Sequence, residues 1–224
     1  MSKRLLRFCT NGRETNLAAL RLPLDFGSPK APLEIEIGFG KGRYLLERAA
    51  ADRDRRFLGI ESAAFYYNLV NRRAQREGLG NLTTICGDAL YVIATCLAPG
   101  SAEVVHVYFP DPWPKSKHHR RRLLDRTSVD LLVGLLSPAG RLFFATDHVE
   151  YGEVVVEVLA AQGGVEVERL EEVWPDGPRT NYELKYQSEG RSILRLVVRR
   201  TAEVSDLLSS ERKVAISAGW ESFP

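Results

Sequence analysis

A proline-rich segment followed by cations is the part of this sequence that most constrains its chemistry. Residues 109 to 122 read Phe-Pro-Asp-Pro-Trp-Pro-Lys-Ser-Lys-His-His-Arg-Arg-Arg. Proline fixes its own backbone torsion and lacks an amide donor, so this segment cannot be a helix or an inner strand. We expect a stiff turn that holds Asp111 and Trp113 in set directions. A fixed carboxylate beside an indole, followed by a cationic patch, suits an anionic polymer whose base must be held still.

The cations of this patch are clustered, although the chain as a whole is nearly neutral. Five of the eight residues from 115 to 122 are cationic, namely Lys115, Lys117, Arg120, Arg121 and Arg122. The formal net charge is only +2 over 224 residues, so the distribution of charge indicates a polyanionic partner where the total does not. The alternative interpretation is a proline-stiffened structural loop that leads into a solvated helix start.

A second group of residues lies where a short apolar run meets a glycine-rich turn. Residues 34 to 42 read Glu-Ile-Glu-Ile-Gly-Phe-Gly-Lys-Gly, and a helical pattern follows. Glycine lets a ligand approach the backbone at the carboxyl end of a parallel strand. The spacing departs from the dinucleotide fingerprint, because Arg43 stands where Gly or Ala is needed. Glu36 would repel a pyrophosphate, whereas S-adenosylmethionine carries a net positive charge that an acid attracts.

Acidic residues also end two further apolar runs, each of which is expected to be a strand. Glu61 follows the run 56–60, at the position from which a carboxylate accepts hydrogen bonds from both ribose hydroxyls of an adenosine cofactor. Asp88 follows the run 81–86 and could accept from an adenine amine, although an acid there can also cap the next helix. Acids at the ends of three successive strands predict a site for S-adenosylmethionine.

Short apolar runs alternate with helical stretches from about residue 33, which is the pattern of a doubly wound α/β sheet. Strands are expected at Leu33–Ile37, Arg56–Ile60, Asn81–Cys86, Glu103–Tyr108, Gly140–Thr146, Gly164–Leu170 and Ile193–Val198. Helices are expected at Gly42–Ala50, Ala63–Glu77, Ala89–Leu97, Arg121–Leu136 and Val149–Ala161. The polar stretch 171–192 between the last two strands is expected to be a loop, so that the sheet ends in an antiparallel hairpin.

Several motifs together resemble the bacterial tRNA (guanine-N(7)-)-methyltransferases. They are the glycine-rich segment 36–42, the Gly-Asp-Ala turn 87–89, the proline-rich segment, Thr-Asp-His-Val-Glu-Tyr at 146–151 and Arg-Thr-Asn-Tyr-Glu-Leu-Lys at 179–185. The resemblance runs from about residue 33 to 200. It implies a Rossmann-like class I S-adenosylmethionine-dependent methyltransferase fold with a mostly parallel seven-stranded sheet. It also implies methylation of guanine 46 in the variable loop of tRNA. Phe39 departs from the family pattern, which has a small residue or Cys there.

The resemblance further implies a role for each motif residue. Asp111 would be catalytic and would lie close to the methyl donor. The methyl donor would be bound by Glu36, Gly38, Gly40, Glu61, Asp88 and Asp111. The tRNA would be contacted by Lys115, Asp147, Thr180, Asn181, Tyr182 and Glu183. No metal and no obligatory protein partner are implied, and the protein would be a monomer or a homodimer.

The chemistry implied for Asp111 is physically reasonable. Guanine N7 carries an in-plane lone pair and no proton, so its methylation needs no general base. The enzyme must orient the base and tolerate a guanine that becomes cationic, and Asp111 could accept from guanine N–H groups and offset that charge. Similar acid-Pro-Pro-aromatic loops occur in amine methyltransferases, so methylation of an adenine or guanine amine is an alternative. The three strand-end acids argue against a non-catalytic RNA-binding protein, and the cationic run argues against a small-molecule methyltransferase.

Four polar residues have competing interpretations. His106 lies in an apolar run and is expected to be a core histidine rather than a ligand. Asp147 ends a strand and could face the substrate or cap the next helix. Thr180 and Glu183 are expected in a polar loop, either as substrate contacts or as solvated residues.

The chain is expected to form one domain, because it shows no repeat, low-complexity run or linker. Residues 1–32 would be a basic N-terminal arm, 33–200 the methyltransferase domain, and 201–224 a C-terminal tail. Three widely spaced cysteines without a Cys-x-x-Cys pair argue against a zinc site and favour a reducing compartment. No stretch reaches the roughly 18 apolar residues of a membrane span, and no signal peptide is recognisable, so a cytoplasmic protein is expected.

Overall fold

The computed structural model describes residues 7–10, 13–15, 31–126 and 128–201. Most of the expected arm and all of the expected tail after residue 201 lie outside the described residues, so the predictions for them stay predictions. Within the described ranges, none of the helices has the length and apolar character needed to cross a membrane.

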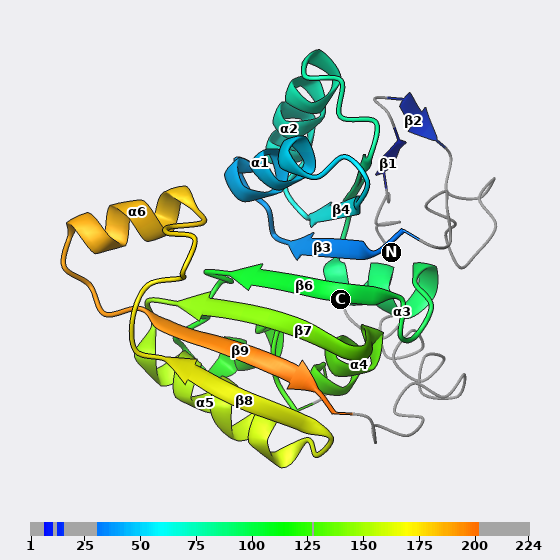
Figure 1. Ribbon diagram of the computed structural model, residues 1–224. Helices are drawn as coiled ribbons and strands as arrows, with labels where there is room; N and C mark the ends of the chain where they lie inside the picture. Colours follow the sequence, from blue (N-terminus) through cyan, green and yellow to red (C-terminus); the bar gives the residue numbers. More distant parts are fainter. Residues whose placement is uncertain (1–6, 11–12, 16–30, 127, 202–224) are drawn as a thin grey trace.

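The described strands form a single nine-stranded sheet in the order β2-β1-β5-β4-β3-β6-β7-β9-β8 (Figure 1). The strands are β1 (Arg7–Thr10), β2 (Arg13–Thr15), β3 (Leu33–Ile37), β4 (Arg56–Glu61), β5 (Leu82–Cys86), β6 (Ala102–Tyr108), β7 (Leu136–Thr146), β8 (Val165–Leu170) and β9 (Leu194–Arg200). The helices are α1 (Arg43–Ala51), α2 (Ala64–Arg76), α3 (Ala89–Cys96), the 3₁₀ helix η2 (Ser116–Arg121), α4 (Val129–Leu135), α5 (Val149–Ala161) and α6 (Asn181–Ser188).

Seven of these strands make the mixed sheet that the sequence predicts. Strands β5, β4, β3, β6 and β7 are parallel neighbours, and β9 lies antiparallel between β7 and β8. The expected antiparallel ending is therefore confirmed, although its connection contains α6. Strands β1 and β2 extend the sheet beyond β5 by antiparallel pairing, which the sequence did not predict. This pairing covers backbone groups of β5 that would otherwise form an open edge.

Helices cover both faces of the sheet, which gives three layers (Figure 1). Helices α3, α4 and α5 pack on one face, where the core includes Ile35, Val107 and Phe144. Helices α1 and α2 pack on the other face, where the core includes Phe57 and Tyr67. Side chains alternate between the two faces of a strand, so β3 contributes its isoleucines to the first core and its two glutamates to the opposite face.

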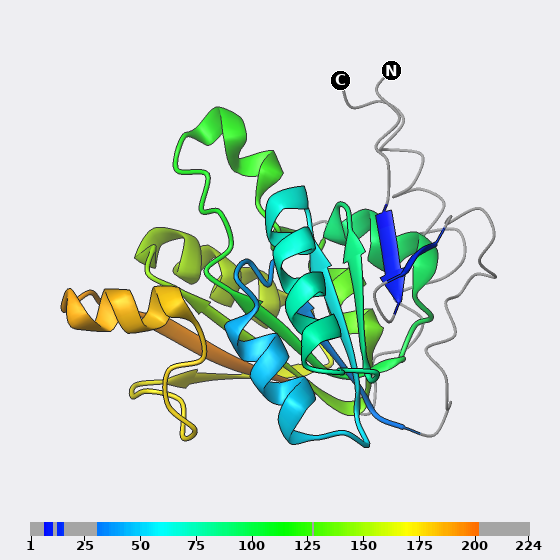
Figure 2. The same cartoon turned by 90° about the horizontal axis from the view of Figure 1, so that it is seen from above.

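The parallel strands all end at the same edge of the sheet, which is where ligands bind in open α/β folds. In Figure 1 the arrowheads of β3, β6 and β7 point toward the side on which α6 lies. The segment that carries η2 follows β6 and stands out from the body of the molecule (green in Figure 2). The loops after β3, β4, β5, β6 and β7 contain Gly38, Ser62, Asp88, Asp111 and Asp147 respectively.

The predicted helix Arg121–Leu136 is wrong at its beginning, because α4 starts only at Val129. A reciprocal turn explains the late start. The Ser128 amide donates to Asp125 Oδ1 at 2.8 Å, and the Asp125 amide donates to Ser128 Oγ at 2.9 Å. Short polar side chains that bond nearby backbone groups favour caps and turns over helix interiors.

Candidate active site

Three glycines shape the loop that follows β3. Gly38, Gly40 and Gly42 all have positive φ angles, of 72°, 50° and 68°, which side-chain-bearing residues rarely adopt. A Cβ on Gly42 would lie 2.5 Å from Val70 Cγ2, so this glycine is needed for packing against α2. A Cβ on Gly38 or Gly40 would meet nothing within 4 Å. The first two glycines therefore leave open space beside the backbone, as a ligand site requires.

Glu36 lies on β3 directly before this loop and is buried, with 4% of its surface exposed. Burial raises the pKa of Glu36 to about 8, and the nearby Glu34 and Glu61 carboxylates add to this effect, while a hydrogen bond from the Leu45 amide opposes it. Its Oε2 atom has no hydrogen-bond partner among the described residues. A buried carboxylate oxygen without a partner needs an explanation, and a cationic ligand beside the glycine loop would supply the missing charge.

Glu61 holds the glycine loop against the end of β4. Its Oε2 accepts from the Gly40 amide at 2.9 Å, and its Oε1 accepts from the Ala63 amide at 2.8 Å. Asp88 caps α3, because its Oδ1 accepts from the Tyr91 amide at 3.2 Å. The capping interpretation of Asp88 is thus confirmed. Contacts of these two acids with a methyl donor stay predictions, to which their place at the carboxyl edge adds support.

Asp111 is exposed, and its carboxylate has no hydrogen-bond partner among the described residues. The residues on either side of its prolines are held in the left-handed region, with φ angles of 50° at Phe109 and 42° at Trp113. Such backbone strain concentrates at functional sites, where the surrounding structure imposes it. Arg122 provides part of this support, since its Nε donates to the Pro112 carbonyl at 2.9 Å. The loop therefore presents, in a constrained backbone, a carboxylate that no other described side chain or amide uses.

One of the five clustered cations is not available to a partner. Arg122 is buried, with 5% of its surface exposed, and its guanidinium lies 4.8 Å from the centre of the Tyr151 ring. The expectation that all five cations could reach a polyanion is therefore wrong for Arg122, which the fold uses to hold the loop. The exposed members are Lys115, Lys117, Arg120 and Arg121. Arg121 also lies over the Trp113 ring, 5.0 Å from its centre.

The predicted polar loop 171–192 is wrong at 181–188, where α6 forms. Thr180 caps this helix, since its Oγ1 accepts from the Glu183 amide at 3.0 Å. Glu183 is fully buried, and its two oxygens accept from the Arg179 amide at 2.9 Å and from Arg195 Nε at 2.8 Å. The Thr-x-x-Glu spacing is the signature of a capping box and was the local signal for this helix.

The two ends of the Thr180–Glu183 motif face different surroundings. The buried carboxylate of Glu183 accepts hydrogen bonds from the Arg179 amide and from Arg195. In contrast, Asn181 is exposed and Tyr182 is 52% exposed. The Tyr182 ring lies 6.4 Å from the Phe109 ring, which places it beside the loop that carries Asp111. Among these motif residues, Asn181 and Tyr182 are therefore the best placed to meet a substrate, and a substrate contact by Glu183 stays a prediction.

Arg179 joins the segment before α6 to the end of β6. Its Nη1 donates to the hydroxyl of Tyr108 at 2.7 Å. The guanidinium lies 4.5 Å from the centre of the Trp174 ring and 4.6 Å from that of Phe143, and it also pairs with Asp176 at 3.0 Å. Cation–π contacts and charged hydrogen bonds are strong where water is partly excluded. Arg179 therefore anchors α6 beside the strand that leads to Asp111.

His106 is a core histidine, as predicted. Its Nδ1 lies 2.7 Å from the Tyr108 hydroxyl, and its Nε2 lies 2.9 Å from Glu34 Oε1. Because the Tyr108 oxygen accepts from Arg179, its own proton is best given to Nδ1, and Nε2–H then donates to Glu34. Burial lowers the pKa of His106, in keeping with this neutral form. Burial raises the pKa of Glu34, but hydrogen bonds from His106 and Arg48, together with the positive charge of Arg48, outweigh it and hold the pKa below its usual value.

Asp147 does not cap α5. That position belongs to His148, whose Nδ1 accepts from the Tyr151 amide at 3.3 Å. Asp147 Oδ2 instead accepts from Arg191 Nη1 at 3.1 Å, and the Arg191 guanidinium lies 4.5 Å from the centre of the Tyr186 ring. If Asp147 contacts the substrate, as predicted, its carboxylate must bind both the substrate and Arg191.

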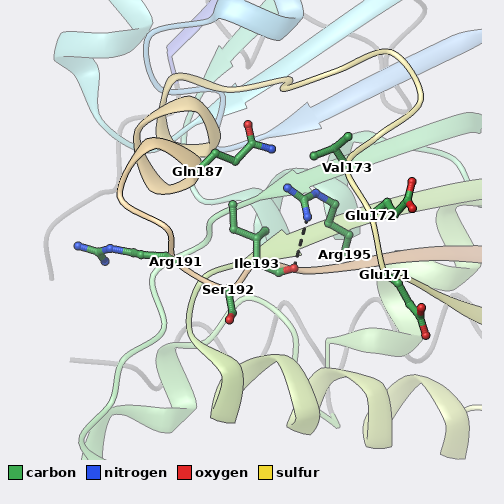
Figure 3. Close-up of a pocket in the computed structure, with 8 residues that line it drawn as sticks. All are labelled: Glu171, Glu172, Val173, Gln187, Arg191, Ser192, Ile193 and Arg195. Atoms are coloured by element: carbon green, nitrogen blue, oxygen red, sulfur yellow. Dashed lines mark hydrogen bonds between the residues drawn. The ribbon is translucent and has the colours of Figure 1, made fainter.

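A cavity of about 560 Å³ lies between α6, the start of β9 and the segment after β8 (Figure 3). Its lining is Glu171, Glu172, Val173, Gln187, Arg191, Ser192, Ile193 and Arg195. None of these residues belongs to the predicted methyl-donor site. In the described part of the chain, no cluster of three or more His, Cys, Asp or Glu is placed to hold a metal ion.

Comparisons with known proteins agree with this geometry. A family model described as "Putative methyltransferase" matches residues 30–196. The tRNA (guanine-N(7)-)-methyltransferase of Nitrosococcus oceani is 38% identical over 169 residues, which cover 75% of this chain and 72% of that protein. The enzyme of the same name from Nocardia farcinica is 37% identical over 198 residues, which cover 83% and 73%. The chain belongs to the tRNA (guanine-N(7)-)-methyltransferase family.

Solved structures of more distant proteins show the same fold. A variant of the 16S rRNA (adenine(1408)-N(1))-methyltransferase from Catenulisporales acidiphilia, solved with S-adenosylmethionine, matches with a TM-score of 0.59 at 17% identity and covers 90% of this chain and 99% of that chain. The 16S rRNA methyltransferase KamB matches with a TM-score of 0.62 at 11% identity and covers 87% and 99%. The fold is that of the class I S-adenosylmethionine-dependent methyltransferases, as predicted.

One departure from the family pattern has a structural explanation. Phe39 is buried, with 4% of its surface exposed, in the core between α1, α2 and the sheet. A Cβ on Gly59 would lie 2.6 Å from the Phe39 ring, so the absence of a side chain on β4 makes room for it. Phe39 therefore points into the core and does not fill the space beside Gly38 and Gly40.

The anchoring role of Arg179 can be measured through stability. Arg179→Met is expected to lower the free energy of unfolding by roughly 2–4 kcal/mol, because Tyr108 and Asp176 lose a charged partner and four aromatic rings lose a cation. Urea unfolding would measure this. The matched control is Arg169→Met. The side chains of Arg169 and its ion-pair partner Glu153 are each about half exposed, so this variant should lower the free energy of unfolding by less than about 1 kcal/mol. Equal losses in the two variants would contradict the anchoring role.

Proposed function

We propose that this protein transfers a methyl group from S-adenosylmethionine to N7 of guanine 46 in the variable loop of tRNA. The chemistry and the substrate class are supported by the family and by the printed names of its relatives. Position 46 rests on the resemblance of the sequence motifs. Such a substrate places the reaction in the cytoplasm.

The residues around the glycine loop fit the methyl donor. When bound, S-adenosylmethionine supplies an electrophilic methyl group on a positively charged sulfur. Glu36 offers this cation a buried carboxylate oxygen, Oε2, that accepts from no donor in the described part of the chain. Gly38 and Gly40 leave open space beside the backbone, and Glu61 fixes the loop through the Gly40 amide. Charge and space at this edge thus favour a cationic nucleoside ligand over a dinucleotide with a pyrophosphate.

The observation that carries the proposal is the carboxylate of Asp111, which is exposed on a strained loop and has no partner within the described ranges. It lies after β6, which is the strand next to β3 and its glycine loop. Asp111 can accept hydrogen bonds from guanine N–H groups and thereby turn the ring so that N7 faces the methyl donor. Its negative charge also offsets the positive charge that guanine gains on methylation. No side chain has to remove a proton, because N7 carries none.

The surroundings of Asp111 suit an RNA substrate. Lys115, Lys117, Arg120 and Arg121 are exposed directly after it and can bind phosphates. Asn181 and Tyr182 are exposed on α6, where the tyrosine ring can contact a base. The site thus offers separate groups for the phosphates and for the base.

The modified position can be tested with transcripts of one tRNA that carry either guanine or adenine at position 46. Methylation to 7-methylguanosine is expected for the guanine transcript only, and strand cleavage at the modified base would locate it. Equal methylation of both transcripts would assign the enzyme to another guanine. A product methylated on an exocyclic amine would favour the amine-methyltransferase alternative.

The buried Glu36 predicts that binding of the methyl donor depends on pH. Burial raises the pKa of Glu36 to about 8, so the ligand-free protein is mostly protonated there at neutral pH. Because the cationic ligand favours the ionised carboxylate, binding should release a proton and tighten as the pH rises, by up to about tenfold per unit below pH 8. Isothermal titration between about pH 6 and pH 8.5 in buffers of different ionisation enthalpy would measure both effects.

Glu36→Gln is the control for this prediction. The variant should bind the methyl donor weakly and without the pH dependence. A raised carboxyl pKa means that the folded state binds the proton more tightly than the unfolded state. The ligand-free wild type should therefore lose stability as the pH rises from about 5 to about 8, and the variant should lose less. Identical pH profiles for the two proteins would show that Glu36 does not face the ligand.

A further inference from the structure

One face of α2 is exposed and carries an unusual combination of side chains. Phe65 is 72% exposed, and Asn68, Arg72 and Arg76 are exposed as well. Their spacings of three, four and four residues place them in one line along the helix. We call these four residues the α2 stripe. Its length is about 16 Å, since a helix rises about 1.5 Å per residue.

The orientation of this helix is fixed by its opposite face. Tyr67 and Val70 are buried in the core that α1 and α2 share with the sheet. The stripe must therefore face solvent. The Phe65 ring contacts the Tyr66 ring edge to face, with 5.3 Å between the ring centres. A large aromatic side chain is thus held at the surface, although its burial would be worth roughly 1.5–3 kcal/mol.

Helix α2 itself carries only positive charge, and the next acid along the chain is Glu77, which directly follows the helix. Residues 62–76 include three arginines and no acidic residue. Arg73 turns back and donates to the Lys41 carbonyl at 3.0 Å. Arg72 and Arg76 form no ion pair with any described residue. Two arginines that have no ion-pair partner in the described part of the chain, on a helix without acidic residues, are complementary to a polyanion.

The stripe begins at the edge of the sheet where the methyl group is transferred. Helix α2 starts three residues after Glu61, which ends β4 and holds the glycine loop through Gly40. Phe65 is therefore at the end of the helix that lies on the active-site edge, and Arg76 is at the far end. The cations after Asp111 follow a different strand, β6, so the α2 stripe would be a second contact surface.

We propose that the α2 stripe binds the RNA strand of the tRNA substrate, with Phe65 stacking on a base near the methylated guanine and Arg72 and Arg76 contacting phosphates. This inference rests on the proposed function. Aromatic side chains that stack on bases, combined with cations that follow the backbone, are how proteins bind single strands without reading their sequence. A protein partner is disfavoured, because Phe65 is the only large apolar residue of the stripe and interface cores need contiguous apolar surface.

The two parts of the stripe predict different changes in tRNA binding. The double variant Arg72→Gln/Arg76→Gln should lower the slope of log affinity against log salt concentration by about 1.4 to 1.8, or 0.7 to 0.9 per phosphate contact. Phe65→Ala should weaken binding roughly tenfold at each salt concentration without changing the slope, as expected for the loss of one stacked base. Binding of S-adenosylmethionine should be unchanged in both variants.

The matched control removes two arginines elsewhere. Arg169→Gln/Arg199→Gln changes the net charge equally, and both side chains are about half exposed on β8 and β9 and are paired with glutamates. This variant should keep the wild-type slope. Arg72→Lys/Arg76→Lys should also keep it, because phosphate contacts depend mainly on charge.

The outcomes separate this inference from the function on which it rests. Wild-type affinity and slope in the Phe65 and arginine variants, in a protein that still methylates tRNA, would overturn the α2 stripe and leave the function intact. If these variants lost self-association but kept tRNA binding, the inference would also be overturned, because the α2 stripe would then be a contact between two copies of the protein. A wild-type protein that neither binds nor methylates tRNA would overturn both proposals.

Discussion

Replacement of Asp111 by asparagine is expected to slow methyl transfer by roughly 10²–10³, the usual effect of removing one preorganised electrostatic group. The fold and the affinity for tRNA should change little, because this exposed carboxylate has no hydrogen-bond partner among the described residues. The amide keeps an acceptor but cannot offset the charge that grows on guanine. Single-turnover rates at saturating tRNA and methyl donor would measure the effect.

A matched control for this prediction is Glu150→Gln, which removes an exposed acid at the start of α5. The control should retain the wild-type rate. A near-wild-type rate in Asp111→Asn would contradict the electrostatic role of Asp111. At saturating methyl donor, where the pH dependence of donor binding through Glu36 no longer affects the rate, a wild-type rate that climbs tenfold per pH unit through neutrality would contradict methylation at N7, since it would indicate removal of a proton from the substrate.

The exposed cations after Asp111 should dominate the salt dependence of tRNA binding. Replacement of Lys115, Lys117, Arg120 and Arg121 by glutamine is expected to lower the slope of log affinity against log salt by about 2.8 to 3.6. This range assumes that all four side chains contact phosphates. Filter binding or fluorescence titration between about 50 and 200 mM salt would give the slope.

Arg122 provides the contrast, although the sequence groups it with these four residues. Arg122→Gln should leave the salt slope near its wild-type value, because the guanidinium is buried. It should instead destabilise the fold by about 1–3 kcal/mol through loss of the hydrogen bond to the Pro112 carbonyl. An unchanged slope in the fourfold variant would show that tRNA binds elsewhere on the protein.

The parts of the fold that could be predicted from the sequence carry strong local signals. Apolar runs placed β3 at its observed bounds, and apolar periodicity placed α5 at Val149–Ala161. The glycine loop lies at the same edge of the sheet as Glu36 near the end of β3, Glu61 at the end of β4 and Asp88 after β5. Parallel strands place their carboxyl ends at one edge, so the sequence could predict this arrangement. The prolines around Asp111 likewise predict a stiff loop. In the structure, Phe109 and Trp113 of this loop adopt left-handed backbone conformations.

The parts that could not be predicted depend on contacts between distant segments. In the sequence, Arg122 cannot be distinguished from its cationic neighbours, because its contact with Tyr151 depends on the position of α5 in the fold. Arg179 finds its aromatic neighbours on α1, β6, β7 and the segment after β8, so no local pattern reveals that it is an anchor. Glu183 is buried because Arg195 on the next strand pairs with it. The start of α6 is different, because the Thr-x-x-Glu signal was present in the sequence.

The most direct test of the proposed function is methyl transfer to unmodified total tRNA, followed by digestion to nucleosides and identification of the methylated product. Wild-type protein with S-adenosylmethionine is expected to yield 7-methylguanosine, and Asp111→Asn is expected to yield a small fraction of it in the same time. A methylated product other than 7-methylguanosine, or no methylated product from a protein that binds the methyl donor, would contradict the proposed function.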